Sequence, residues 1–155
     1  MKISIQTQDF DLTAELALLR GKRTDIGAIV SFVGLVREMD ADNSHVSSMT
    51  LEHYPGMTEK ALAAIMKQAS ERWRVIDATI IHRVGVLQAA EQIVLVMVAS
   101  AHRADAFAAC EFIMDYLKTE APFWKKEKTA DGEHWVEAKV TDDIARERWG
   151  RSRKS

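Results

Sequence analysis

The chain has 155 residues, of which 47% are hydrophobic and 28% charged, and its formal net charge is -2. This composition is typical of one globular domain, excludes a fibrous or disordered chain, and gives no general attraction to nucleic acid or acidic membranes. The longest apolar run, IGAIVSFVGLV at 26–36, is well short of the roughly 20 residues that a membrane-spanning helix requires. We therefore expect a single domain over 1–150, a basic tail at 151–155, and neither a nucleic-acid nor a membrane partner.

The N-terminal segments change from strand periodicity to helix periodicity and back. KISIQT at 2–7 alternates polar and apolar residues, which predicts a strand. DLTAELALLR at 11–20 predicts a short helix with Asp11 or Thr13 as its N-cap, and the β-branched run at 26–36 predicts a buried strand. The start of the chain has no apolar core of the kind found in secretory signals, so a cytoplasmic location is expected.

The next segments predict a loop, a strand and a long helix. MDADNSH at 39–45 is rich in turn-forming residues, and VSSMTLEHY at 46–54 alternates again. The stretch at 57–73 follows a Pro-Gly pair and predicts a helix of about four turns, with Thr58 as a possible cap. Apolar residues recur there at helical spacing, at Leu62, Ile65, Met66, Ala69 and Trp73.

Two β-rich runs and a second long helix follow. DATIIHRVGVL at 77–87 and EQIVLVMVAS at 91–100 predict paired central strands. The segment at 102–120 predicts a helix, which ends before Pro122 because proline disfavours helical geometry in the preceding residue.

The C-terminal part contributes one more expected strand, HWVEAKV at 134–140, after a turn at 131–132. Because the β runs adjoin one another in pairs, a simple parallel crossover sheet is not expected. The sequence predicts an α+β domain with a mixed or antiparallel sheet and two long helices.

Lys118 is the first candidate for a functional residue. When residues 104–120 are wound as a helix, apolar side chains cover more than half of the circumference, and Lys118 lies about 20° from Phe107 at their border. Lys118 could simply lay its methylenes on apolar surface and keep its ammonium in water. Alternatively, crowding by Lys125 and Lys126 could lower its pKa and make it a base, a nucleophile or a phosphate ligand.

Cationic residues also stand where strands end. His102 and Arg103 lie between a β run and a helix start, where free backbone N–H groups favour anions and a guanidinium can bind phosphate. The alternative for His102 is a capping or core role. Arg37 follows a strand that contains Gly34, which permits a close backbone approach; otherwise it is an ordinary surface arginine.

Metal and thiol chemistry have little support in the sequence. Cys110 is the only cysteine, and its position within a helical pattern favours a small buried hydrophobe over a nucleophile. His53 and His82 have no carboxylate or second histidine at ligand spacing, so no metal site is expected. The residues alone predict a basic, aromatic-walled cleft for a phosphorylated ring compound.

Four segments in order carry a family resemblance: LEHYPGMTEKAL at 51–62, IIHRVG at 80–85, SAHRADAF at 100–107 and FIMDYLKTEAPFWKKE at 112–127. They resemble the large, catalytic subunit of molybdopterin synthase, and the likeness extends from about Gly27 to Trp149. The resemblance implies an α/β-hammerhead fold and a homodimer at the centre of a heterotetramer. At each end it implies a small ubiquitin-like sulfur-carrier subunit whose Gly-Gly terminus bears a thiocarboxylate.

The resemblance also implies a reaction and its residues. Two sulfurs pass from the carrier to cyclic pyranopterin monophosphate and form the dithiolene of molybdopterin, with no cofactor or metal. The family's essential lysines fall on Lys118 and Lys125, of which Lys118 is favoured for proton transfer and Lys125 for holding the carrier terminus or the pterin, although the roles could be reversed. The family's substrate-binding positions fall on Leu35, Val36, Arg37, His102, Arg103, Lys118, Lys125, Lys126 and Glu127.

Arg37, His102 and Arg103 are expected to hold the phosphate and the pterin ring, some of them across the dimer interface. Two positions depart from the family pattern, because Leu35 stands where relatives often carry lysine and Lys139 where they often carry arginine. The alternative function is a non-catalytic module that binds a ubiquitin-like tail or a phosphorylated pterin.

Overall fold

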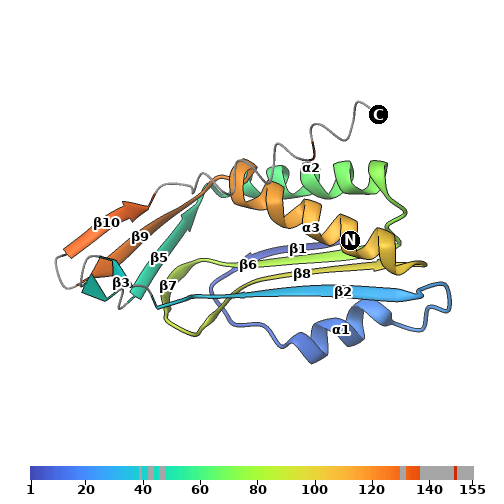
Figure 1. The fold of residues 1–155 in the computed structure, drawn as a ribbon, viewed down its shortest axis with the longest axis horizontal. Helices are drawn as coiled ribbons and strands as arrows, with labels where there is room; N and C mark the ends of the chain where they lie inside the picture. Colours follow the sequence, from blue (N-terminus) through green and yellow to red (C-terminus); the bar gives the residue numbers. More distant parts are fainter. Residues whose placement is uncertain (39, 42–43, 46–47, 130–131, 137–148, 150–155) are drawn as a thin grey trace.

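The computed structural model describes residues 1–38, 40–41, 44–45, 48–129, 132–136 and 149 (Figure 1). The expected tail at 151–155, the turn residue Asp131 and the departing residue Lys139 lie outside the described residues. No helix in the described part of the chain is long and apolar enough to cross a membrane.

The main sheet has four strands in the order β1-β6-β8-β2. β1 runs parallel to β6, whereas β8 is antiparallel to both β6 and β2, so the expected mixed sheet is confirmed. The two β-rich runs do supply its central pair. The strands span Lys2–Gln6 (β1), Asp77–Arg83 (β6), Gln92–Ser100 (β8) and Ala28–Leu35 (β2).

Helices cover both faces of the main sheet (Figure 1). The two long helices, α2 (Met57–Arg72) and α3 (Arg103–Glu120), pack on one face, and α1 (Leu12–Arg20) packs on the other. Asp11 caps α1 by accepting a hydrogen bond from the Ala14 backbone, as predicted. The core between the sheet and the long helices includes Leu62, Ile65, Met66, Ala69, Ile80, Val96, Phe112 and Ile113.

A second, antiparallel sheet extends beyond one end of the main sheet (Figure 1). Its strand order is β10-β9-β5-β7, and its strands span Gly132–Val136 (β10), Phe123–Thr129 (β9), Ser48–His53 (β5) and Gly85–Gln88 (β7). Two-residue strands at Asp40–Ala41 (β3) and Ser44–His45 (β4) form a separate pair. Together the two sheets and the long helices confirm the α+β class.

The structure corrects two expectations about single elements and adds one strand. The run at 77–87 is two strands rather than one, because the chain turns at Gly85 (φ 91°) and passes from the main sheet into the second. The run at 26–36 is an edge strand rather than a buried one, since Phe32 is 40% exposed and Leu35 56% exposed. β9 was not expected at all.

Arg83 joins three segments of chain at the end of the main sheet. Its guanidinium donates hydrogen bonds to the carbonyl oxygen of Thr7, at 3.0 and 3.2 Å, and to that of Gln92 at 2.8 Å. The carboxylates of Asp9 and Glu91 lie 3.9 and 3.7 Å from the same guanidinium. A planar group with several donors suits this position, which fixes the end of β6 beside the second sheet.

Candidate functional site

The two predicted lysines lie near a buried histidine where the two sheets meet. His82, near the end of β6, is only 6% exposed, and it pairs across the sheet with Val94. The pKa of His82 is lowered to about 4, chiefly by burial and to a lesser extent by electrostatic repulsion from Lys118, Lys125 and His53, whereas a backbone hydrogen bond to Arg83 opposes the shift. Lys118 from α3 and Lys125 from β9 therefore act on the same imidazole.

The stacking of His82 on Phe123 brings the strand of Lys125 close to the histidine. The His82 ring stacks on Phe123 with 4.0 Å between ring centroids and 21° between ring planes. Alternate side chains of a strand share one face of its sheet, so Lys125 lies on the same face of β9 as Phe123. Lys125 is half-buried and Lys118 is exposed, and the prediction that Lys118 faces a cleft stays a prediction.

Thr58 ties this region to the start of α2. Its hydroxyl accepts a hydrogen bond from the Tyr54 backbone at 3.1 Å and donates one to the Pro122 carbonyl at 3.2 Å. The expected capping role is wrong, because Gly56 is the N-cap of α2 and Thr58 is fully buried. Thr58 instead holds the connection between α3 and β9, and thus the entry into the strand of Lys125.

Aromatic side chains do surround the opening segment of β9, as the sequence predicted. Trp124 packs against Tyr54 with ring centroids 4.8 Å apart, and its indole nitrogen donates to Glu52 at 3.2 Å. On the other face of the strand, Phe123 lies between His82 and His53, the latter at 6.4 Å. Of these aromatic side chains, Phe123 lies on the face of β9 that carries Lys125, whereas Trp124 lies on the opposite face, so the expected aromatic-walled cleft stays a prediction.

The Leu35–Arg37 segment lies at the same end of the main sheet as His82. β2 has a register irregularity between Gly34 and Leu35, and Leu35 pairs with Gln92 at the beginning of β8. A side chain added at Gly34 would meet Val94 at 2.7 Å, which confirms the close approach expected there. Val36 is buried against the second sheet, whereas Leu35 and Arg37 are exposed.

His102 and Arg103 lie at the opposite end of the main sheet. The start of β2 at Ala28 pairs with Ser100, directly before these residues, and both side chains are exposed. His102 occupies the N-cap position of α3 without a capping side-chain hydrogen bond, so neither a capping nor a core role is observed. A Cβ at Gly27 would lie 2.1 Å from the Ala101 carbonyl oxygen, so this position accommodates only glycine without rearrangement.

One chain therefore divides the predicted substrate residues between two places. Lys118, Lys125 and Leu35–Arg37 share one end, and His102 with Arg103 occupies the other. The eight residues of β2 separate these ends by about 23 Å, at roughly 3.3 Å per residue. The side chains of Lys126 and Glu127 lie outside the described part of the structure.

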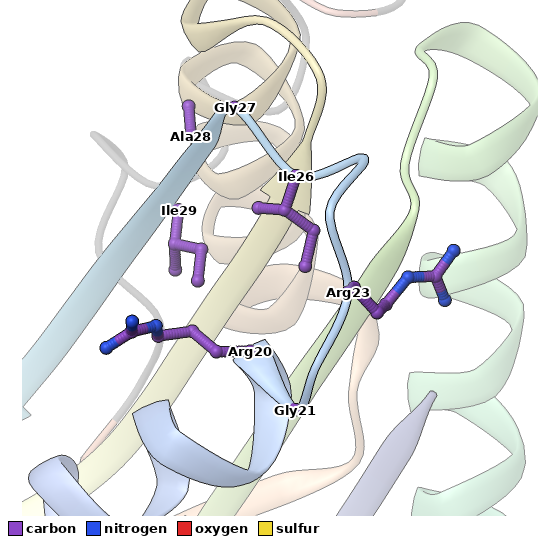
Figure 2. Close-up of a pocket in the computed structure, with 7 residues that line it drawn as sticks. All are labelled: Arg20, Gly21, Arg23, Ile26, Gly27, Ala28 and Ile29. Atoms are coloured by element: carbon purple, nitrogen blue, oxygen red, sulfur yellow. The ribbon is translucent and has the colours of Figure 1, made fainter.

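A hollow of about 360 Å³ lies away from the lysines (Figure 2). It is formed where α1 ends and β2 begins, on the α1 side of the sheet, and its lining includes Arg20 and Arg23. These arginines point away from one another, and Arg23 is paired with Asp25 at 2.7 and 2.9 Å. The hollow thus does not offer a pair of converging guanidinium groups to an anion.

The thiol has the structural role expected of it. Cys110 is 4% exposed, and burial raises the pKa of its thiol to about 11, so it is a buried small side chain. Among the described residues, no group of three or more His, Cys, Asp or Glu side chains is placed to hold a metal ion.

From the sequence, His82 was expected only not to bind a metal, and its place beside the strand of Lys125 was not predicted. A signal was present, because His82 continues the alternation of Ala78 and Ile80 toward the helix-covered face of β6. A polar ring at such a position requires hydrogen-bond partners, and the sequence did not show which ones the fold supplies.

The fold and this region define an α+β domain that gathers lysines around an uncharged imidazole where two sheets join. The family model described as MoaE protein matches residues 5–120, and the chain belongs to this family.

Relatives over nearly the whole length agree with this membership. The chain is 64% identical over 148 residues to a Ralstonia nicotianae protein named molybdopterin synthase catalytic subunit, covering 96% of this chain and 84% of the relative. It is 59% identical to the molybdopterin biosynthesis MoaE protein of Burkholderia ambifaria, with a TM-score of 0.82 and coverage of 96% and 97%. A Helicobacter pylori structure, a complex of subunits 1 and 2 of molybdopterin-converting factor, shares the fold at 18% identity, with a TM-score of 0.72 and coverage of 87% and 90%.

Proposed function

We propose that this chain is the catalytic subunit of a molybdopterin synthase. In this proposal two small ubiquitin-like carrier subunits in succession each deliver the one sulfur of their C-terminal thiocarboxylate to cyclic pyranopterin monophosphate. Water cleaves each acyl–sulfur bond and leaves the carrier with a carboxylate, and the product is the molybdopterin dithiolene. Membership of the MoaE family and 64% identity to a protein named molybdopterin synthase catalytic subunit support it.

The observation that carries the proposal is the placement of Lys125 on the face of β9 whose Phe123 stacks on the buried His82, with Lys118 in the last turn of α3. The reaction brings together two anions, the carrier terminus and the substrate phosphate, and cations beside an apolar wall reduce their repulsion. We assign proton transfer to Lys118, and we assign the carrier terminus or the pterin to Lys125. Both ammonium groups would stabilise negative charge that develops when the thiocarboxylate adds to carbon.

The residues at the end of β2 would complete the substrate site. Arg37 can form two parallel hydrogen bonds with a phosphate, whereas Leu35 offers only its backbone and an apolar side chain. Val36 is buried and would fix the backbone of this segment against the second sheet. Lys126 and Glu127 follow Lys125 directly and are proposed to contact the same substrate.

A second copy of the chain would bring His102 and Arg103 to this site. Among the described strands none pairs with the outer edge of β2, and its apolar Phe32 is 40% exposed. Phe107 of α3 is 61% exposed as well, so an apolar surface continues beside this edge. Antiparallel pairing of two β2 edges about a twofold axis would place the start of one strand beside the end of the other. We therefore propose a central homodimer with one carrier at each end.

The test is reconstitution of the complete reaction. The protein is mixed with thiocarboxylated carrier and cyclic pyranopterin monophosphate, and dithiolene product is quantified. We expect turnover with the wild type, a loss of at least about 100-fold for Lys118→Ala or Lys125→Ala, and wild-type turnover for Lys67→Ala, an exposed lysine of α2. Binding of both reactants without turnover by the wild type would establish the non-catalytic module instead.

A further inference from the structure

The tautomer of His82 is set by its own strand. Nδ1 lies 2.8 Å from the carbonyl oxygen of Arg83, and because a carbonyl oxygen only accepts hydrogen bonds, Nδ1 must carry the proton. In the uncharged ring Nε2 then holds a lone pair and is a hydrogen-bond acceptor. The ring is almost completely buried, so this acceptor has a fixed direction.

The ring also supports the strand that carries Lys125. Its stacking on Phe123 fixes the first residue of β9, and Lys125 follows two residues later on the same face. Leu51 and His53 of β5 pair with Lys125 and Phe123, so the neighbouring strand keeps the same register. A change in the His82 ring would consequently be transmitted to Lys125 through one aromatic contact.

Titratable groups from three packed elements act electrostatically on His82. Lys118 approaches from α3, Lys125 from β9 and His53 from β5. His53 is itself 3.6 Å from Glu59 of α2, which provides a carboxylate next to it. An uncharged ring in this position avoids adding one more positive charge to the group.

From this geometry we infer that His82 is a positioning residue for Lys125. Its uncharged ring holds Phe123, and thereby Lys125 on the same face of β9, and its Nε2 accepts a hydrogen bond from the ammonium of Lys125. An acceptor beside an ammonium favours the charged form and raises its pKa. The inference rests on the proposed function, because it assigns His82 an effect on Lys125, which is named there.

Three substitutions of His82 separate its support of Phe123 from the hydrogen bond that its Nε2 accepts. His82→Phe keeps an aromatic ring for Phe123 but removes both nitrogens. His82→Asn keeps a donor for the Arg83 carbonyl but lacks an acceptor at the position of Nε2. It replaces the Phe variant in the test if that variant does not fold. His82→Gln retains an acceptor at about the position of Nε2. Ile80→Val disturbs the core on the same face of the same strand and is the matched control.

The measurement is a titration of lysine side chains carrying a ¹³C label at Cε, followed by NMR in the complex with the carrier. We expect His82→Phe and His82→Asn to lower the pKa of Lys125 by about half a unit or more. The alkaline limb of the pH–rate profile should move to lower pH by the same amount. His82→Gln should restore both quantities, and Ile80→Val should change neither.

The inference is overturned if the Phe and Asn variants titrate like the wild type, because His82 would then be a core histidine only. It is also overturned if His82→Gln titrates like the Phe variant. The lysine titration does not depend on turnover. Full activity of Lys118→Ala and Lys125→Ala would therefore refute the proposed site without deciding the titration result.

Discussion

At the scale of single residues, two neighbours on β6 divide the work of fixing one end of the main sheet. Arg83 is tied to the carbonyl oxygens of Thr7 and Gln92, and it holds the segments before α1 and at the start of β8. His82 points to the other face, where Phe123 covers it. Successive side chains of a strand point to opposite faces of the sheet. Arg83 can therefore hold chain segments together on one face while His82 supports the strand of Lys125 on the other.

The buried His82 should make the protein sensitive to acid. The pKa of His82 is about 4 in the folded chain, whereas an unperturbed histidine, as in the unfolded chain, has a pKa of 6.5. Between these values the unfolded chain binds the proton and the folded chain does not, so stability is lost as the pH falls from about 6.5 to about 4. We expect His82 to remove about 2 kcal/mol between pH 7 and pH 5.

Urea denaturation at the two pH values measures this loss. The free energy of unfolding should fall by about 2 kcal/mol less in His82→Phe than in the wild type, whatever the absolute stability of the variant. Since the other four histidines are present in both proteins, their contribution cancels in the comparison. Equal losses in the two proteins would show that His82 is charged in the fold.

At the scale of elements, the entry into β9 depends on α2 through Thr58. Replacing Thr58 by valine keeps the shape of the side chain and leaves the Tyr54 N–H and the Pro122 carbonyl without their partner. We expect Thr58→Val to cost about 1–3 kcal/mol in the free energy of unfolding. We also expect kcat to fall several-fold, because a small displacement of Lys125 weakens its alignment.

Denaturation and steady-state kinetics measure the two effects of Thr58→Val. Thr13→Val, at an exposed position of α1, is the control and should change neither quantity. If Thr58→Val loses stability but keeps the wild-type kcat, Thr58 does not position β9 for the reaction.

The sequence predicted those helices and strands whose hydrophobic pattern stays the same from one end of the element to the other. α2 and α3 were found because their apolar residues recur at helical spacing, and β6 and β8 because they are apolar central strands. β9 reads FWKKEKT, which lacks an apolar alternation, and only its pairing with β5 and β10 makes it a strand. Residues 77–87 form two strands, β6 and β7, because Gly85 has a positive φ, which the sequence does not specify.

The lysines of the candidate site could be named from the sequence, but their surroundings could not. The family resemblance pointed to Lys118 and Lys125, and the residues alone indicated that the segment around them is basic and aromatic. The role of His82 requires its contact with Phe123 of β9, which is far away along the chain. Such contacts follow from tertiary packing, and no local pattern encodes them.

At the scale of the whole molecule, the length of β2 keeps two groups of proposed substrate residues apart. Leu35–Arg37 and the lysines lie at one end, and His102 with Arg103 lies at the other, about 23 Å away. Antiparallel pairing of two β2 edges would unite them, so each site would take residues from both chains. The exposed Phe32 and Phe107 would then be covered by the partner.

Mixed dimers test this shared site. We expect a dimer of one Arg103→Ala chain and one Lys118→Ala chain, purified with two different tags, to have about half of the wild-type turnover. One of its two sites then combines an intact Lys118 with an intact Arg103, whereas both parent dimers have none. The matched control pairs Lys118→Ala with Lys125→Ala, which lie at the same end, so every site lacks one lysine and turnover stays at the parental level. If the Arg103–Lys118 dimer were as inactive as that control, each site would belong to one chain, and the proposed pairing of β2 edges would have to be abandoned.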